Sequence, residues 1–319
     1  MSRILFLHRD DAPFVRADLA IIKERHDVRA LDCSPGPGFI TMGRALARAD
    51  LSYSWFALGY AARAVLAGKI LRRPSIVVAG GWDVVSMPEI GYGAVRSARG
   101  RARARLTLRS ANRVLAFSKW SANGIRDLTG REAEVVFLGV DVERFRPAAE
   151  KENLVVTVGN VSRENLERKG LRTFVRAASH LPDVRFVLVG RHVDDAVEEL
   201  RRDASPNVEF PGYVSDEQLT NLLARSHVYV QVSYNEGFGL SLAEAMAAGC
   251  VPVVTRAGAI PEVAGDVGFY VPFGDSRATA RAVSDAFASG REGAARIRIV
   301  DNFPLDRRRR TLFRIIEEV

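Results

Sequence analysis

Short apolar runs alternate with helical segments along the whole chain, and this pattern limits the possible folds more than any other feature. In the first half, residues with helical spacing lie between the apolar runs, for example over 12–24 and 56–71. The runs are rich in β-branched residues and leucine and fall at Arg3–Leu7, Asp27–Leu31, Ser75–Ala79, Arg113–Phe117 and Glu134–Leu138. Such alternation predicts βαβ units and a parallel sheet.

The second half repeats the pattern. Strands are predicted at Leu154–Gly159, Val184–Gly190, Val208–Phe210, Val228–Val232, Val251–Thr255 and Gly268–Val271. Helices are predicted at Lys169–His180, Ala196–Asp203, Ser215–Ala224, Leu240–Ala248 and Ser276–Ser289. Because the strands are apolar throughout, both faces of the sheet are expected to be covered.

The length of 319 residues suggests two domains, and 47% apolar with 26% charged residues is ordinary globular usage. A polar stretch around Pro147 separates a strand that ends from a new one, so we expect domains at 1–147 and 148–302 and a helical tail at 303–319. Two distant cysteines exclude a zinc module or disulfide scaffold and suit a reducing compartment. No apolar run is long enough for a spanning helix or a signal peptide, so a cytoplasmic location is expected.

The positive charge is concentrated in the first half. Residues 1–147 carry 24 basic and 14 acidic side chains, whereas residues 148–319 carry 22 and 24. This imbalance predicts an anionic partner for the first domain: a membrane surface, a nucleic acid or an anionic substrate. No nucleic-acid-binding pattern is present, which argues against the second.

The most informative segment, residues 235–254, follows a predicted strand and leads into a helix. Gly237 and Gly239 permit a tight turn that a phosphate can approach closely, and free N–H groups at a helix start attract anions. Glu236 and Glu244 flank this turn, and carboxylates suit sugar hydroxyls better than phosphate. Taken alone, the glycines also fit a plain capping loop.

The segment resembles the E-x7-E signature of the retaining glycosyltransferases of family four, also called glycosyl transferases group 1. Glu236 and Glu244 fall at its two glutamates. The resemblance implies that Glu236 contacts the donor sugar and that Glu244 accepts hydrogen bonds from the nucleotide ribose. It also implies that backbone amides around Phe238, Gly239 and Leu240 face the diphosphate.

A second match begins where a predicted strand ends at Gly159. The family has an arginine and, six residues later, a lysine followed by glycine, and Arg163 and Lys169 have this spacing. Two cations can neutralise a nucleoside diphosphate as it leaves. Arg168 is a less favoured substitute for Lys169. The alternative is two surface cations at a helix start, where cations are unfavourable.

Two further segments concern the nucleotide. Residues 208–219 resemble the family's strand, glycine, loop and helix, so the backbone around Tyr213 and Val214 is implied to contact the base. Ser215 also has a glutamine three residues later, which is typical of a capping box. Arg191 ends another strand and either touches phosphate or is an ordinary surface residue.

In the first half, a strand runs into the pair Gly80–Gly81 followed by Trp82 and Asp83. An aromatic ring and a carboxylate suit an acceptor, since the ring stacks and the carboxylate accepts a hydroxyl proton. The segment resembles an acceptor loop of the family, but a turn with a buried tryptophan fits equally. His8 ends the first strand, where many family members have a glycine-rich loop that this chain lacks, so His8 is a provisional acceptor residue.

The segment Arg96–Arg113 holds seven arginines and no acidic residue. As a basic helix it is predicted to bind an anionic membrane surface or acceptor, each basic residue near a membrane contributing about 1 kcal/mol. The alternative is a solvated helix face.

The resemblance covers residues 115–275 and extends to the first half only in topology. It implies a GT-B fold, with two Rossmann-like, doubly wound α/β domains facing a cleft and a C-terminal helix that returns to the first. It implies a retaining hexosyltransferase that uses a UDP-, GDP- or ADP-sugar and a glycan, lipid-linked or small-molecule acceptor. No Asp-x-Asp motif is present, so no metal and no cofactor are expected. The alternatives are a non-catalytic, membrane-associated scaffold or a sugar-nucleotide epimerase.

Overall fold

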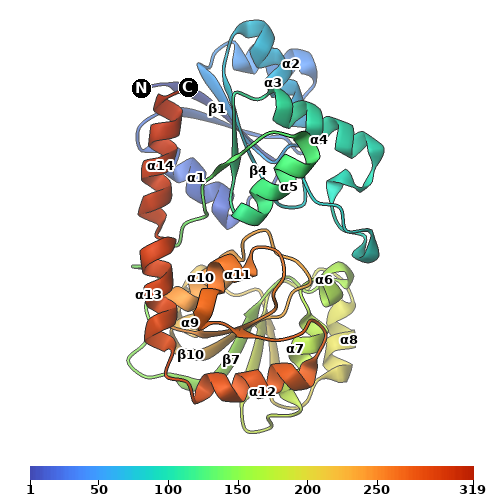
Figure 1. Cartoon of the computed structure of the whole chain (residues 1–319), viewed down its shortest axis with the longest axis vertical. Helices are drawn as coiled ribbons and strands as arrows, with labels where there is room; N and C mark the ends of the chain where they lie inside the picture. The colour runs from blue at the N-terminus through green and yellow to red at the C-terminus, as the bar shows by residue number, and fades with distance from the viewer. The chain divides into compact units, whose positions relative to one another are not determined.

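A computed structural model describes all 319 residues, and the chain forms two compact units (Figure 1). The N-terminal unit comprises Met1–Leu138 and Asp306–Val319, and the C-terminal unit comprises Gly139–Leu305. Each unit contains one six-stranded sheet. No helix is both long and apolar enough to cross a membrane.

The first boundary between the units lies between Leu138 and Gly139. We expected it later, in the polar stretch around Pro147. The side chain of Arg296 explains the difference, because it donates to the carbonyls of Phe145 and Val142 at 2.8 and 3.1 Å. Val140 also exchanges backbone hydrogen bonds with Phe303 and Leu305 at 2.9 and 2.8 Å. Residues 139–147 are therefore bound into the C-terminal unit.

The sheet of the N-terminal unit has the order β2-β1-β3-β4-β5-β6, and all its strand pairs are parallel. Its strands are β1 (Arg3–His8), β2 (Asp27–Asp32), β3 (Leu51–Trp55), β4 (Ser75–Ala79), β5 (Arg113–Ala116) and β6 (Glu134–Val135). The chain order reverses between β1 and β3. Such a reversal leaves a crevice beyond the carboxyl ends of the two strands, where open α/β sheets bind ligands.

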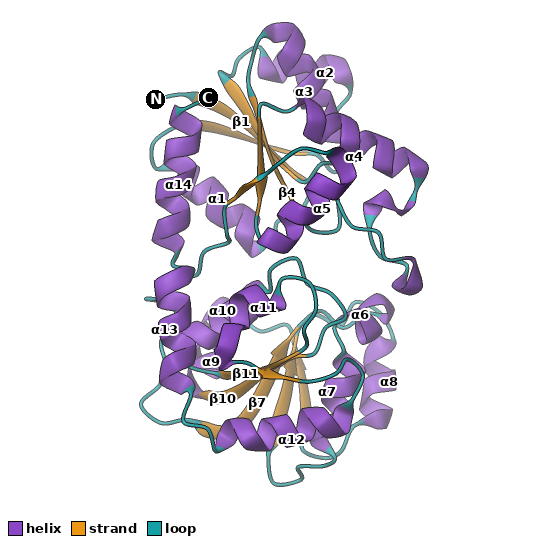
Figure 2. Ribbon diagram, in the orientation of Figure 1, coloured by secondary structure: helices purple, strands orange, loops and turns teal.

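Helices cover both faces of this sheet (Figure 2). They are α1 (Pro13–Lys23), α2 (Phe39–Leu46), α3 (Gly59–Leu71), α4 (Ala98–Ser110), α5 (Lys119–Thr129) and α14 (Leu305–Glu317), with short 3₁₀ turns η1 (Pro88–Ile90) and η2 (Ala94–Arg96). The last helix, α14, comes from the far end of the chain. It joins this unit through Arg308, which is buried against Asp18 of α1.

Strand β3 is central in the sheet, but the sequence analysis did not predict it. Its sequence, LSYSW, places Ser52 and Ser54 between apolar residues, although all five residues are buried. Both hydroxyls lie in the interior without a hydrogen-bond partner. Because the serines interrupt the sequence of apolar residues, this strand lacks the continuous apolar run by which the other buried strands are predicted.

The C-terminal unit has the sheet order β12-β11-β10-β7-β8-β9, again with parallel pairs. Its strands are β7 (Glu152–Val158), β8 (Arg185–Val189), β9 (Val208–Gly212), β10 (Ser226–Gln231), β11 (Val251–Val254) and β12 (Phe269–Tyr270). The order reverses between β7 and β10. The predicted parallel sheets are thus confirmed, and the carboxyl ends of β7 and β10 mark the expected ligand position.

The helices of the C-terminal unit are α6 (Arg163–Arg168), α7 (Leu171–Ala178), α8 (Ala196–Asp203), α9 (Asp216–Arg225), α10 (Leu240–Ala247), α11 (Ile260–Ala264), α12 (Ser276–Phe287) and α13 (Glu292–Asn302), with the 3₁₀ turn η3 (Gly265–Val267). The predicted capping box starts α9. Ser215 accepts from the amide of Gln218, and the Gln218 side chain accepts from the amide of Ser215. Helices α6, α11 and α13 were not predicted.

Candidate active site

The loop after β10 carries Glu236 and is held from two sides. The amide of Tyr234 donates to the carbonyl of Arg168 at 2.8 Å, and the carbonyl of Glu236 accepts from the amide of Ala259 at 2.9 Å. Gly258 has φ +56°, and a Cβ there would lie 2.2 Å from the carbonyl oxygen of Glu236. The glycine therefore allows two loops to meet and fixes the Glu236 backbone at the carboxyl edge of the sheet.

Lys169 and Glu236 come together at this edge. The Lys169 Nζ lies 2.9 Å from Oε1 of Glu236, and both side chains are mostly buried. The same oxygen accepts a long hydrogen bond, 3.4 Å, from the Ser233 hydroxyl. An ammonium group has three donors, so two N–H groups of Lys169 remain for further acceptors. The fold thus brings two of the predicted site residues, Lys169 and Glu236, into direct contact.

Two glycines let the Lys169 side chain reach this position. Gly170 has φ +65°, and a Cβ on it would lie 2.1 Å from the carbonyl oxygen of Val232, at the end of β10. The aliphatic stem of Lys169 lies across Gly159, where an added Cβ would be 2.8 Å from Lys169 Cδ. A larger side chain at Gly170 would require the Val232 backbone to move, and one at Gly159 would require Lys169 to move.

Opposing effects act on the carboxyl group of Glu236. Burial raises its pKa, but the charges of Lys169 and Arg168 and the hydrogen bonds from Lys169 and Ser233 together lower the pKa below its usual value. Glu236 is therefore ionised at neutral pH. An ionised carboxylate accepts hydrogen bonds only, which suits sugar hydroxyls as donors.

Helix α10 starts beside Glu236 at Gly239, which has φ +91° and provides no side-chain cap. No acidic residue lies in the first turn. The amide side chain of Gln231, the last residue of β10, lies against Gly239 and is buried with neither its nitrogen nor its oxygen paired. Sequence reasoning missed Gln231, although a polar residue that ends an apolar strand is a usable signal. These groups form an anion-attracting position next to Lys169.

Phe238, also predicted to lie at the diphosphate, has a buried side chain. Phe238 is 2% exposed, and its ring packs edge-on against Phe303 at 5.5 Å. The ring thus anchors the loop that leads into α10. The hydroxyl of Tyr229 on β10 donates to the hydroxyl of Ser241 on α10 at 2.9 Å, which ties the start of the helix to the strand.

Glu244 lies on α10, about one turn after the helix begins at Leu240. It is half-buried, and its side chain has no hydrogen-bond partner in the protein. Burial raises the pKa of its carboxyl group to about 7, although the charge of Arg144 acts in the opposite direction. Buried carboxylates are normally paired, so an unpaired one suggests a position for a hydroxyl-bearing ligand.

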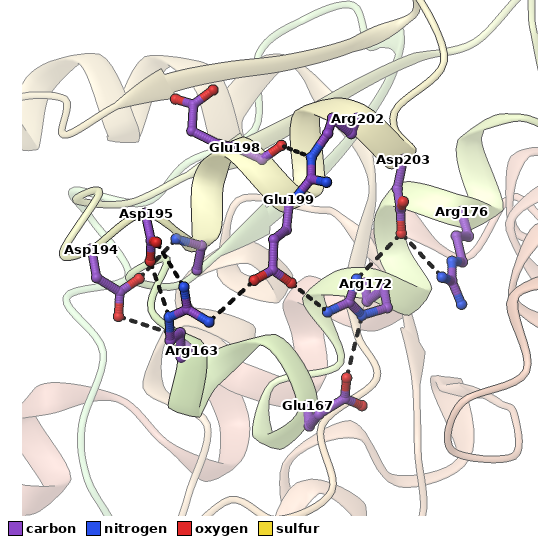
Figure 3. A network of polar contacts seen from close by, with 11 residues as sticks. Arg163, Glu167, Arg172, Arg176, Asp194, Asp195, Glu198, Glu199, Arg202 and Asp203 are labelled. Carbon is purple, nitrogen blue, oxygen red and sulfur yellow. Dashed lines mark hydrogen bonds and ion pairs between the residues drawn. The ribbon is translucent and has the colours of Figure 1, made fainter.

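Arg163 has a different position from the one predicted. Figure 3 shows its guanidinium facing α8, where it binds Asp195 at 2.6 Å and Glu199 at 3.4 Å. Glu199 also binds Arg172 at 3.1 Å, so the network joins α6, α7 and α8. The cation whose charge acts on Glu236 beside Lys169 is Arg168. The six-residue spacing fitted Arg163, but helix α6 turns that side chain toward α8.

Arg191, predicted either to touch phosphate or to lie on the surface, contacts Tyr213, which is predicted near the nucleotide base. The guanidinium of Arg191 lies over the ring of Tyr213, 4.9 Å from its centroid. Tyr213 is 64% exposed, and Val214 is half-buried. The backbone amide of Arg191 donates to the side chain of Asn160 at 3.2 Å, which ties this strand end to the loop after β7.

In the N-terminal unit, Trp82 and Asp83 line a cavity of about 640 Å³, whereas Gly81 and His8 do not. Trp82 is 43% exposed, so the alternative of a buried tryptophan is wrong. Asp83 is 1% exposed and accepts from the amides of Ala57, Gly80 and Gly81. Its carboxylate holds the loop together, which corrects its predicted role as acceptor of a substrate proton.

Two arginines of the basic segment Arg96–Arg113 make specific contacts with a neighbouring helix. Within α4, the side chains of Arg105 and Arg109 donate to the carbonyls of Leu128 and Thr129, both at 2.8 Å. These two arginines donate to carbonyls at the end of α5, and both remain exposed. No group of three or more His, Cys, Asp or Glu side chains is placed to hold a metal ion.

Residues 152–289 match the family model of glycosyl transferases group 1. The resemblance inferred from the motifs of this segment is therefore confirmed. A phosphatidyl-myo-inositol mannosyltransferase of Mycolicibacterium smegmatis is 32% identical over 164 residues, which are 48% of this chain and 42% of the relative. An α-1,2-mannosyltransferase of Dictyostelium discoideum, named for GDP-mannose and a dolichol-linked acceptor, is 28% identical over 45% of this chain and 34% of its own length. The matches thus span less than half of these relatives.

Solved structures match over the whole length. HepE of Anabaena, in complex with UDP and glucose, has a TM-score of 0.83 at 20% identity and covers 100% of both chains. Sucrose-phosphate synthase of Thermosynechococcus elongatus has a TM-score of 0.79 at 18% identity and covers 100% of this chain and 99% of its own. The chain has the GT-B fold of these proteins.

Proposed function

We propose that the protein is a glycosyltransferase that moves a hexose from a nucleotide-sugar to an acceptor hydroxyl with retention of configuration and without a metal ion. The observation that carries the proposal is the contact of Lys169 with Glu236 at the point where the strand order reverses. The family match over residues 152–289 and the nucleotide-sugars named for similar proteins support it.

The donor diphosphate is placed between Lys169, Arg168 and the start of α10. The two free N–H groups of Lys169 and the first backbone amides of the helix face its oxygens. Fixed donors and cations stabilise the charge that grows on the leaving diphosphate. Arg168 replaces Arg163 in this role, because the charge of Arg168 acts on Glu236 whereas the guanidinium of Arg163 binds Asp195.

The two glutamates hold the remaining parts of the donor. Glu236, ionised and fixed by Lys169, accepts hydrogen bonds from the hydroxyls of the transferred sugar. Glu244, which has no protein partner, accepts from the ribose hydroxyls. The base lies toward Tyr213 and Val214.

Retention follows from attack on the face that the diphosphate leaves. The acceptor oxygen bonds to the anomeric carbon as the bond from this carbon to the phosphate oxygen breaks, and the acceptor proton passes to that phosphate oxygen. No side chain is required as a base, since the leaving group takes the proton. The residues around Glu236 position the donor and stabilise charge.

The location belongs to the proposal as well. The positive excess of residues 1–147 supports a cytoplasmic enzyme that is attracted to the anionic inner face of a membrane.

The test is an assay of the full chain with UDP-, GDP- and ADP-sugars, with the anomeric proton of the product followed by NMR. We expect one donor to be consumed, a product with the donor's anomeric configuration, and equal rates with and without a chelator. An inverted product or loss of the rate in chelator would contradict retention or metal independence, and no consumption of any donor would contradict transfer.

A further inference from the structure

The cavity of about 640 Å³ in the N-terminal unit lies outside the proposed donor site. Its wall includes Arg9, directly after β1, and residues 57–59, directly after β3. These are the two strands between which the order of this sheet reverses. The cavity therefore occupies the position at which an open α/β sheet binds a ligand, and its volume is within the range of small-molecule sites.

Four arginines line this cavity: Arg9, Arg63, Arg99 and Arg103. None of their guanidinium groups forms an ion pair or a hydrogen bond with the protein, and the Nε of Arg63 is buried without a partner. Other arginines of this unit are paired, as Arg3 is with Asp50 at 2.7 Å. Four adjacent unpaired guanidinium groups repel one another, and a bound anion removes this repulsion.

The wall holds one acidic residue, Asp83, against the four arginines, and both of its carboxylate oxygens accept from backbone amides rather than from an arginine. The cavity therefore has an excess of positive charge that a bound anion can balance.

Two glycines shape the cavity for these side chains. An added Cβ at Gly36 would lie 2.6 Å from Nη2 of Arg63, so this guanidinium rests directly on the Gly36 backbone. At Gly59 an added Cβ would lie 3.5 Å from Nη1 of Arg103. Gly59 also begins α3, whose start has no side-chain cap and no acidic residue in the first turn. The helix dipole thus adds to the positive potential.

We propose that this cavity binds the phosphate group of a phosphorylated acceptor, with the Arg63 and Arg103 side chains as its main ligands and the exposed Trp82 ring against the adjoining sugar or polyol. Planar guanidinium groups match the oxygens of a phosphate in pairs, and an indole ring packs well on a sugar face. That the ligand is an acceptor rests on the proposed glycosyltransferase function, whereas the binding of a phosphate rests on the cavity alone.

The experiment measures binding to the full chain by calorimetry, with glucose 6-phosphate, with glucose, and with vesicles that contain phosphatidylinositol. We expect glucose 6-phosphate to bind and glucose not to bind. Arg63→Gln and Arg103→Gln should each weaken the binding about tenfold or more, and so should Gly36→Ala, which displaces the Arg63 guanidinium. Arg101→Gln is the matched control, since Arg101 lies on the same helix α4 but does not line the cavity.

The vesicle arm separates a soluble from a lipid-linked phosphate. Binding of vesicles alone that Arg63→Gln abolishes also supports the site, with a lipid headgroup as its source. If neither glucose 6-phosphate nor vesicles bind, or if binding is the same in the Arg63 and Arg101 variants, the inference is overturned. Binding of UDP, GDP and ADP to the same samples reports on the donor site separately, so failure of the proposed function is distinguished from failure of this inference.

Discussion

Lys169 and Glu236 are 67 positions apart in the chain, yet their side chains meet at 2.9 Å. Gly170 and Gly258 make this possible, because each lets one loop pass directly over the backbone of another. The pair combines an ionised carboxylate with an ammonium that keeps two donors free. This relationship is the structural basis of the proposed donor site.

Arg168 is expected to matter more for catalysis than Arg163. Arg168→Gln removes a charge that acts on Glu236, whereas Arg163→Gln removes a guanidinium that is 63% exposed and bound to Asp195. We expect the first variant to lower kcat/KM about tenfold to a hundredfold, in line with the loss of one charged contact to a leaving group. Steady-state kinetics of both variants test this. A larger loss in the Arg163 variant would restore the assignment made from the sequence.

Glu244 is expected to make stability depend on pH. Its folded pKa of about 7 lies above the ordinary value of 4.5, so between these values the folded state binds more protons than the unfolded state. The folded protein therefore loses stability as pH rises from about 5 to 8, by about 2–3 kcal/mol. Glu244→Gln lacks this loss. Urea unfolding of both proteins at pH 5 and pH 8 measures it, and parallel curves would refute the raised pKa.

The buried pair of Arg308 and Asp18 is expected to hold α14 in the N-terminal unit. Its two hydrogen bonds measure 2.6 and 2.7 Å, and Tyr53 donates to the same carboxylate at 2.6 Å. Asp18→Asn should lower the free energy of unfolding by about 3–5 kcal/mol, because it leaves a buried cation without its counter-charge. Asp11→Asn is the control, since it breaks an exposed pair with Arg16 and should change stability by less than about 1 kcal/mol. Equal effects in urea unfolding would contradict the buried role.

Asp83 is expected to act on stability rather than on proton transfer. Asp83→Ala leaves three backbone amides, of Ala57, Gly80 and Gly81, without an acceptor. We expect a loss of at least about 2 kcal/mol in urea unfolding. At a temperature where the variant is folded, kcat with a saturating acceptor should stay within about tenfold of the wild type. A loss of turnover by several orders of magnitude in a protein of unchanged stability would point to a role as a base.

Much of the fold and the donor loop could be predicted because each depends on local patterns. Apolar runs mark most of the parallel strands, and the two glycines before α10 mark the turn that carries Glu236. Strand β3 was missed because Ser52 and Ser54 interrupt its apolar run. The pattern of neighbours along the chain does not reveal that both serines are buried.

The differences at the sites between expectation and structure have another cause. The spacing favoured Arg163, but the direction of a side chain depends on the helix that carries it, and α6 turns Arg163 toward Asp195 on α8. The role of Asp83 depends on three backbone amides, one of them 26 positions away. The four arginines of the cavity come from three separate segments, so no single sequence motif predicts that they lie together.

The most direct test of the central claim is calorimetric binding of UDP, GDP and ADP to the full chain and to Lys169→Ala. We predict that one of these nucleotides binds the wild-type protein at one site per chain and binds the variant at least tenfold more weakly, since Lys169 is the cation fixed beside Glu236. Equal affinity of the variant and the wild type, or no binding of any of the three nucleotides to a folded protein, would contradict a diphosphate site at Lys169.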